Sequence, residues 1–179
     1  MKKIVVNDTN VFIDLLVVDL LEQFFLLPWE VHTTDFVMQE LLKEGQKDAV
    51  ATYENNGYLH IATFEFQEVV KIINLHESII NKTNLSFIDC SVWYYAKQNN
   101  YMLLTGDRKL RNLALNEGIE VRGIIYVFDE LVLNGILSAG LAAQKLALLK
   151  SINPRLPESE IEKRLKLWEG DQRKEGGSL

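Results

Sequence analysis

Four acidic residues, Asp8, Glu40, Asp89 and Asp107, stand where side chains of a parallel sheet could meet. Asp8 and Asp107 each follow a short apolar segment, whereas Glu40 and Asp89 lie on segments expected to be helices that begin near strand ends. In open parallel α/β folds, ligands bind beyond the carboxyl ends of the strands. Two like charges about 4 Å apart repel by about 4 kcal/mol at an effective dielectric constant of about 20. Four converging carboxylates therefore require protons or cations, and we predict that they form one metal-binding cluster.

The residue types of this cluster favour Mg²⁺ or Mn²⁺ over zinc, because hard cations prefer oxygen ligands. The chain has one cysteine, Cys90, which excludes an internal disulfide and a multi-cysteine zinc site. The three histidines, His32, His60 and His76, have no motif around them, and we interpret them as structural or surface residues.

Each acid also has a simpler interpretation when it is considered alone. Asp8 and Asp107 have sequence contexts that suit helix N-caps, and this is the better interpretation of Asp8 by itself. Glu40 by itself is best explained as a solvated helix residue. Asp89 forms a capping-box pattern with Ser86, but it also falls on the apolar stripe of its helix, where an unpaired carboxylate is costly. The functional interpretation therefore depends on the four acids in combination.

Strands that alternate with helices predict an α/β fold with a parallel sheet covered on both faces. The predicted strands are Lys3–Asn7, Glu30–Thr34, Tyr58–Ala62, Tyr101–Thr105 and Ile119–Gly123. The predicted helices are one from about Val11, then Asp35–Glu44 with Gly45 as its C-cap, Asp48–Asn55, Glu65–Asn81, Ser86–Gln98, Asp107–Asn116, Ile125–Gly135, Ala139–Ser151 and Pro157–Glu169.

Length and composition predict one globular domain, since 179 residues with 47% hydrophobic and 25% charged residues are ordinary for one. We expect that domain to span 1–170, with helices from about 125 to 170 as an appendage and 171–179 as a flexible tail. The apolar stretch 11–29 contains acidic residues, so we predict a buried helix and no membrane span. The apolar run near the N-terminus is too short for a signal peptide, and we expect a cytoplasmic protein.

With these motifs in order, the chain resembles the PIN-domain family of metal-dependent ribonucleases. The resemblance covers about residues 4–123, and the helices that follow look like those of the toxin-like members. The matching segments are Asp8-Thr9-Asn10, Glu40, Ser86-Phe87-Ile88-Asp89 and Leu103-Leu104-Thr105-Gly106-Asp107-Arg108.

The resemblance implies a three-layer α/β/α fold with a five-stranded parallel sheet and Asp8, Glu40, Asp89 and Asp107 as its acidic quartet. It implies hydrolysis of RNA phosphodiesters with Mg²⁺ or Mn²⁺, a role as the toxin of a toxin–antitoxin pair, a small antitoxin partner and a homodimer. The side chains that would position substrate or support the acids are Thr9, Asn10, Ser86 and Thr105.

Three basic residues, Arg108, Lys109 and Arg111, occur where many relatives carry a further acid. They could bind RNA phosphates, or they could form an ordinary solvated helix face, and we weigh the two equally. Their presence leaves open whether one or two metal ions are held. The net charge of −6 argues weakly against a purely electrostatic nucleic-acid binder but does not exclude a nuclease.

Two other classes of α/β protein do not fit the sequence. A haloacid-dehalogenase type of phosphoryl transfer requires an aspartate where this chain has Asn10, and a response-regulator receiver requires paired acids and a lysine that are not found. Two alternatives stay open: a PIN fold used only for protein contact, and a PIN nuclease that acts in RNA processing. The apolar residues of the C-terminal helices are expected to be core more often than a docking surface: Leu141, Leu146, Leu149, Leu165 and Trp168.

Overall fold

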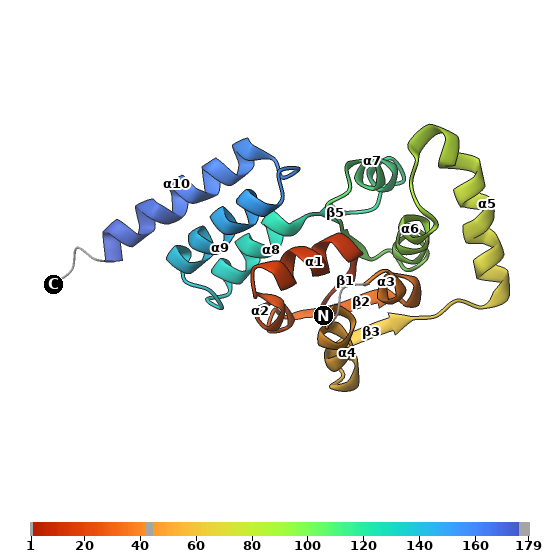
Figure 1. The fold of residues 1–179 in the computed structure, drawn as a ribbon, viewed down its shortest axis with the longest axis horizontal. Coiled ribbons are helices and arrows are strands. Elements are labelled where there is room, and N and C mark those ends of the chain that lie inside the picture. Colours follow the sequence, from red (N-terminus) through yellow and green to blue (C-terminus); the bar gives the residue numbers. More distant parts are fainter. Residues whose placement is uncertain (1, 42–44, 176–179) are drawn as a thin grey trace. The chain divides into compact units, whose positions relative to one another are not determined.

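Five parallel strands form one sheet in the order β3-β2-β1-β4-β5 in the computed structural model, which describes residues 2–41 and 45–175 (Figure 1). Side chains of the central strands, such as Val5, Val6 and Leu103, are fully buried, as expected where helices cover both faces of a parallel sheet. The predicted five-stranded parallel sheet is confirmed. Its strands are β1 (Lys3–Asn7), β2 (Trp29–Thr34), β3 (Leu59–Ala62), β4 (Met102–Leu104) and β5 (Val121–Arg122).

The strand order reverses direction between β1 and β4. From β1 the chain builds outward through β2 to β3, and it then returns to place β4 on the other side of β1. Asn7 pairs with Leu104 in the register of these two strands, and the Asp8 amide continues the ladder by donating to the Leu104 carbonyl at 3.0 Å. Such a switch point is where open α/β sheets bind ligands, and Asp8 lies at it.

The described residues divide into two compact units, which we call the sheet unit, within Met1–Ile13 and Pro28–Arg122, and the helical unit, within Asp14–Leu27 and Gly123–Leu179. In the sheet unit α6 packs against β1, β2 and β4, and α4 packs against β3. The α/β class with three layers is confirmed. The helices that begin in the sheet unit are α1 (Thr9–Val17), α3 (Asp35–Glu40), α4 (Gln46–Asn55), α5 (Phe66–Thr83), α6 (Phe87–Asn99) and α7 (Arg108–Asn116).

The apolar stretch 11–29 does not form one long helix, which corrects the sequence-based expectation. Asp19 adopts a left-handed conformation, with φ of 54°, and the Leu20 amide donates to the Leu15 carbonyl at 2.9 Å, so α1 closes with a Schellman-type turn. A separate short helix, α2 (Leu21–Phe25), follows. Among the described residues, none of the helices has the length and apolar content needed to span a membrane.

The cap predicted at Gly45 is also corrected. Helix α3 ends at Glu40, and Gly45, with φ of 79°, precedes the first residue of α4 and so occupies its N-cap position. The remainder of the helix predicted to reach Glu44, residues 42–44, lies outside the described residues. Glycine suits this position because a positive φ is strained for a residue with a Cβ atom.

The helical unit contains the C-terminal helices α8 (Ile124–Leu133), α9 (Ala139–Ile152) and α10 (Glu158–Glu175), and α9 packs against both α8 and α10 (Figure 1). Leu146, Leu149 and Trp168 are buried, whereas Leu141 is 40% exposed. These residues are therefore mostly core. Helix α10 continues into the segment expected to be a tail, and 176–179 lie outside the described residues.

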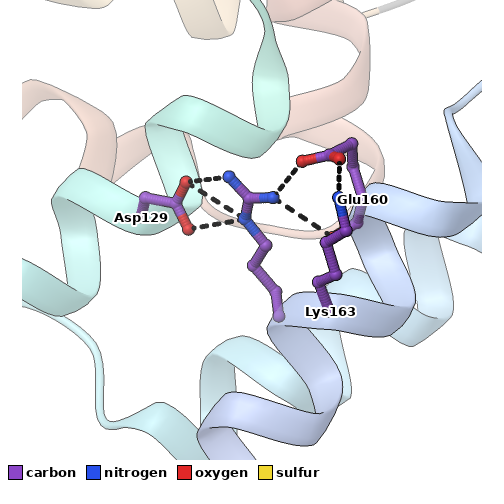
Figure 2. Close-up of polar contacts among 4 residues, drawn as sticks. Asp129, Glu160 and Lys163 are labelled. Carbon is purple, nitrogen blue, oxygen red and sulfur yellow. Dashed lines mark hydrogen bonds and ion pairs between the residues drawn. The ribbon is translucent and has the colours of Figure 1, made fainter.

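Arg164 of α10 joins two acidic side chains from different helices of this unit. Its Nη2 donates to Oδ2 of Asp129 on α8 at 3.0 Å, its Nε donates to both oxygens of Asp129, and its Nη1 donates to Glu160 (Figure 2). The Arg164 side chain is only 25% exposed. A partly buried, forked arginine–carboxylate contact is stronger than an exposed ion pair, so it fixes α10 to α8.

We expect Arg164→Met to lower the free energy of unfolding of the chain by about 1–2 kcal/mol, because Asp129 loses a forked, charge-assisted partner. Lys163→Met is the matched control, since Lys163 is 68% exposed and, among the described residues, pairs with Glu160 of its own helix. It should change stability much less. Urea denaturation of both variants measures this, and equal losses would contradict the assignment.

Candidate active site

Asp8 is a buried carboxylate held on both of its oxygens. It is only 1% exposed at the end of β1. Its Oδ1 accepts from the Thr9 amide at 2.8 Å, and its Oδ2 accepts from Thr105 Oγ1 at 2.7 Å and from Asn10 Nδ2 at 3.4 Å. Asp8 directly follows a central strand, and three hydrogen-bond donors hold its carboxylate. Its side chain therefore has a defined orientation.

Thr105 connects Asp8 to Asp107 at the end of β4. Thr105 is fully buried, its amide extends the ladder to the Arg122 carbonyl at 3.0 Å, and its Oγ1 accepts from the Asp107 amide at 3.0 Å while donating to Asp8. Asp107 is the N-cap of α7, where its Oδ1 accepts from the amides of Lys109 and Leu110 at 2.7 and 2.8 Å. One carboxylate oxygen of Asp107 is thus enough to cap the helix.

Asp89 and Glu40 are each held by a neighbouring hydroxyl. Ser86 and Asp89 form the predicted capping box of α6, in which Asp89 Oδ2 accepts from the Ser86 amide at 2.7 Å and from Ser86 Oγ at 2.8 Å. Thr9 Oγ1 donates to Glu40 Oε2 at 2.5 Å, which brings the end of α3 to the start of α1. Asp89 is thus held at the start of its own helix, and Glu40 is held by the residue that follows Asp8.

One cleft of about 260 Å³ collects three of these acids, Glu40, Asp89 and Asp107. Asp8 lies next to its wall, bonded to Thr9 and Asn10, which line it. The complete lining consists of Thr9, Asn10, Ile13, Glu40, Asn84, Ser86, Asp89 and Asp107. Sequence reasoning missed Ile13 and Asn84. The Lys82-Thr83-Asn84 loop signal placed Asn84 between helices but offered no reason to expect it in the cleft.

Burial and mutual repulsion set the charge of the buried acids. Burial raises the pKa of Asp8 from 3.8 to about 7, and the negative charge of Asp89 adds to the rise, against the hydrogen bonds from Thr105, Thr9 and Asn10. Burial also raises the pKa of Asp89, against the hydrogen bonds from Ser86, and repulsion from Asp107 and Glu40 adds smaller increases. The carboxylates therefore interact electrostatically, as the sequence predicted, and a counter-charge would stabilise their ionised forms.

The donor set suits a hard divalent cation. The cleft is lined by carboxylate, hydroxyl and amide oxygens, without cysteine or histidine. Among the described residues, no hydrogen-bond donor contacts Oδ1 of Asp89 or Oδ2 of Asp107. The hydrogen bonds to the carboxylates of these two acids use the other oxygen of each. Within residues 2–41 and 45–175, however, no three acidic, histidine or cysteine side chains lie close enough together to hold an ion. Ligation by the predicted quartet stays a prediction.

The three basic residues after Asp107 differ in their surroundings. Arg108 and Lys109 are exposed on the first turn of α7. Arg111 is half-buried, and its guanidinium donates to the Thr105 carbonyl at 3.1 Å and to the Val121 carbonyl at 3.4 Å. Arg111 thus ties β4 to β5 beneath the site, and only Arg108 and Lys109 present their charges to solvent.

The histidines lie apart from the cleft lining. His32 is buried on β2, with Nδ1 at 2.8 Å from the Tyr95 hydroxyl and Nε2 at 2.9 Å from Glu30 Oε1, and its ring lies 4.6 Å from that of His60. Burial lowers the pKa of His32. These contacts support the interpretation of His32 as a structural residue.

The structure defines a parallel α/β protein with an acidic cleft at the switch point of its sheet, and comparison with known families narrows this class. The model of the family described as a PIN domain matches residues 4–170. The chain therefore belongs to the PIN-domain family, whose members are generally nucleases. A search of curated proteins found no match to the chain.

The raised pKa of Asp8 has a consequence for stability without divalent ions. The folded protein retains the Asp8 proton between about pH 4 and pH 7, where the unfolded chain releases it, so ionisation of Asp8 destabilises the fold as pH rises through this window. We expect Asp8→Asn to equal the parent protein near pH 4 and to exceed it at pH 8, by at most about 4 kcal/mol at roughly 1.4 kcal/mol per pKa unit.

Chemical denaturation in EDTA across pH 4–8 measures this difference. Added Mn²⁺ should narrow it by stabilising the parent protein alone. A parent protein that gains stability relative to Asp8→Asn as pH rises would contradict the buried, repelled state of Asp8.

Proposed function

We propose that this protein is a metal-dependent ribonuclease that hydrolyses RNA phosphodiesters at the acidic cleft. The observation that carries the proposal is the presence of Glu40, Asp89 and Asp107 around one cleft, with Asp8 hydrogen-bonded to its lining. Asp8, Asp89 and Asp107, with Glu40, would hold Mg²⁺ or Mn²⁺. Such an ion, when bound, activates water and offsets the charge of the scissile phosphate.

The protein's own groups would position and orient rather than form a covalent intermediate. Thr105 fixes Asp8 relative to Asp107, Ser86 fixes Asp89, and Thr9 fixes Glu40. Ser86 and Thr9 each donate to one carboxylate oxygen, of Asp89 and of Glu40, so the second oxygen of each would be available to a ligand. Glu40, the most exposed of the four acids, would orient the attacking water, and hydrolysis would leave a 5′-phosphate.

We further propose that the protein is the toxin of a toxin–antitoxin pair, acting in the cytoplasm as a homodimer that a small antitoxin inhibits. Membership of the PIN-domain family and the resemblance of the C-terminal helices to those of toxin-like members support this role. A PIN nuclease of RNA processing would have the same chemistry, whereas a PIN fold used only for protein contact would have none.

RNA binding should depend on Arg108 and Lys109 but not on Arg111 as a phosphate contact. We expect Arg108→Gln with Lys109→Gln to weaken RNA binding and to lower the slope of log affinity against log salt by about one to two, since single-stranded binding loses about 0.7 per phosphate contact. Fluorescence anisotropy of a labelled single strand, measured at several salt concentrations, tests this. An unchanged slope would assign Arg108 and Lys109 to a solvated helix face.

Cleavage should require the acidic cleft. We expect Asp8→Asn and Asp89→Asn to lower the rate of Mn²⁺-dependent cleavage of single-stranded RNA by at least about 100-fold, a barrier increase of about 2.7 kcal/mol. Glu77→Gln, an exposed acid on α5 that does not line the cleft, is the control and should retain the parent rate.

The same variants separate the proposed roles. Equal activity in parent, Asp8→Asn and Asp89→Asn preparations would identify a contaminating nuclease and leave the protein-contact role. Growth arrest on expression of the parent protein, relieved in Asp89→Asn, would support the toxin role. Cleavage in vitro without growth arrest would favour RNA processing.

A further inference from the structure

Asn84 occupies a constrained position on the wall of the acidic cleft. It ends α5 with φ of 58° and ψ of 27°, in the left-handed region, and its amide donates to the Ile80 carbonyl at 2.8 Å. Two residues later Ser86 caps α6, so Asn84 lies in the short connection that leads to Asp89. Asparagine tolerates the left-handed region better than most residues, but glycine tolerates it best. The helix end alone therefore does not require an asparagine.

The other neutral donors that line the cleft are engaged by its acids. Thr9 Oγ1 donates to Glu40, Ser86 Oγ donates to Asp89, and Asn10 Nδ2 donates to Asp8. The Asn84 side chain, by contrast, makes no hydrogen bond with any residue that the structure describes, although it lines the same cleft. The side-chain amide of Asn84 is thus a hydrogen-bond donor available to a ligand.

A donor of this kind addresses a physical problem of the site. An RNA strand is itself anionic, and it must enter a cleft whose lining carries three carboxylates. A neutral amide binds a phosphate oxygen through N–H groups without adding positive charge that would compete with a bound cation for the acids.

We propose that Asn84 is a positioning residue that donates its side-chain amide to a non-bridging phosphate oxygen of the bound RNA, at a phosphate next to the scissile one. This inference rests on the proposed ribonuclease function. Asn84 does not touch the reacting atoms, so it should act on substrate binding and not on the chemical step.

Asn84→Gly removes the side-chain amide and keeps the left-handed backbone conformation at the helix end. Asn100→Gly is the matched control, because Asn100 also ends a helix, α6, in the left-handed region with φ of 54°, and it does not line the cleft. We expect Asn84→Gly to raise KM for single-stranded RNA about 10-fold, as expected for loss of a hydrogen bond to a charged group, with kcat within about twofold of the parent value. Asn100→Gly should leave both constants unchanged.

A direct binding measurement complements the kinetics. In an Asp89→Asn background, which prevents cleavage, Asn84→Gly should weaken binding of labelled RNA and of the corresponding DNA strand by the same factor. A loss confined to RNA would place the amide on the 2′-hydroxyl and overturn the phosphate assignment.

Equal KM values for parent, Asn84→Gly and Asn100→Gly proteins would overturn the proposed role of Asn84 while the parent's cleavage of RNA upheld the ribonuclease function. An inactive parent protein that binds RNA independently of Asn84 would contradict both. Equal thermal midpoints for the two glycine variants would show that any change in KM does not come from the helix end.

Discussion

The site depends on one buried hydroxyl, that of Thr105. Its Oγ1 donates to Asp8 and accepts from the Asp107 amide, so a single atom sets the position of two acids that are 99 residues apart in the chain. The hydroxyl can do this because β1 and β4 are neighbours in the sheet, and Arg111 donates a hydrogen bond to the Thr105 carbonyl. Without this arrangement Asp8 would be a buried carboxylate lacking its strongest compensating partner.

Asp107 and Asp89 each stabilise a helix end through one carboxylate oxygen, and no described donor bonds to the other oxygen. Asp107 caps α7 through Oδ1, and Asp89 closes the capping box of α6 through Oδ2. The capping and functional interpretations of these residues are therefore not alternatives, although sequence reasoning treated them so. A helix N-terminus also stabilises a nearby negative charge, and such capping partly offsets the repulsion between Asp89 and Asp107.

The sheet and the capping box of Asp89 could be predicted because they depend on local signals, whereas Glu40 was expected only from the four acids in combination and from the family resemblance. The apolar segments mark the strands, and Ser86 with Asp89 shows a capping box in the sequence itself. The short break at Asp19 could not be predicted, because an aspartate with positive φ has no distinctive local pattern. The same holds for Asn84 and for the role of Arg111, since each depends on which distant residues the fold brings close.

The acids of the cleft lie near one another, but not near enough to form a complete metal site among the described residues. Beyond the effect of burial, repulsion from Asp89 raises the pKa of Asp8, and repulsion from Asp107 and Glu40 raises the pKa of Asp89, yet no three of the acidic, histidine or cysteine side chains that the structure describes are close enough to hold an ion. Repulsion explains both facts, because carboxylates without a counter-ion lower their energy by moving apart or retaining a proton. Asp8, held by three donors in the core, has its pKa raised to about 7, chiefly by burial, whereas Glu40 is exposed and is held by one hydrogen bond from Thr9. Positive charge would relieve this repulsion, so a cation held by Asp8, Glu40, Asp89 and Asp107 would allow these acids to lie closer together in their ionised forms.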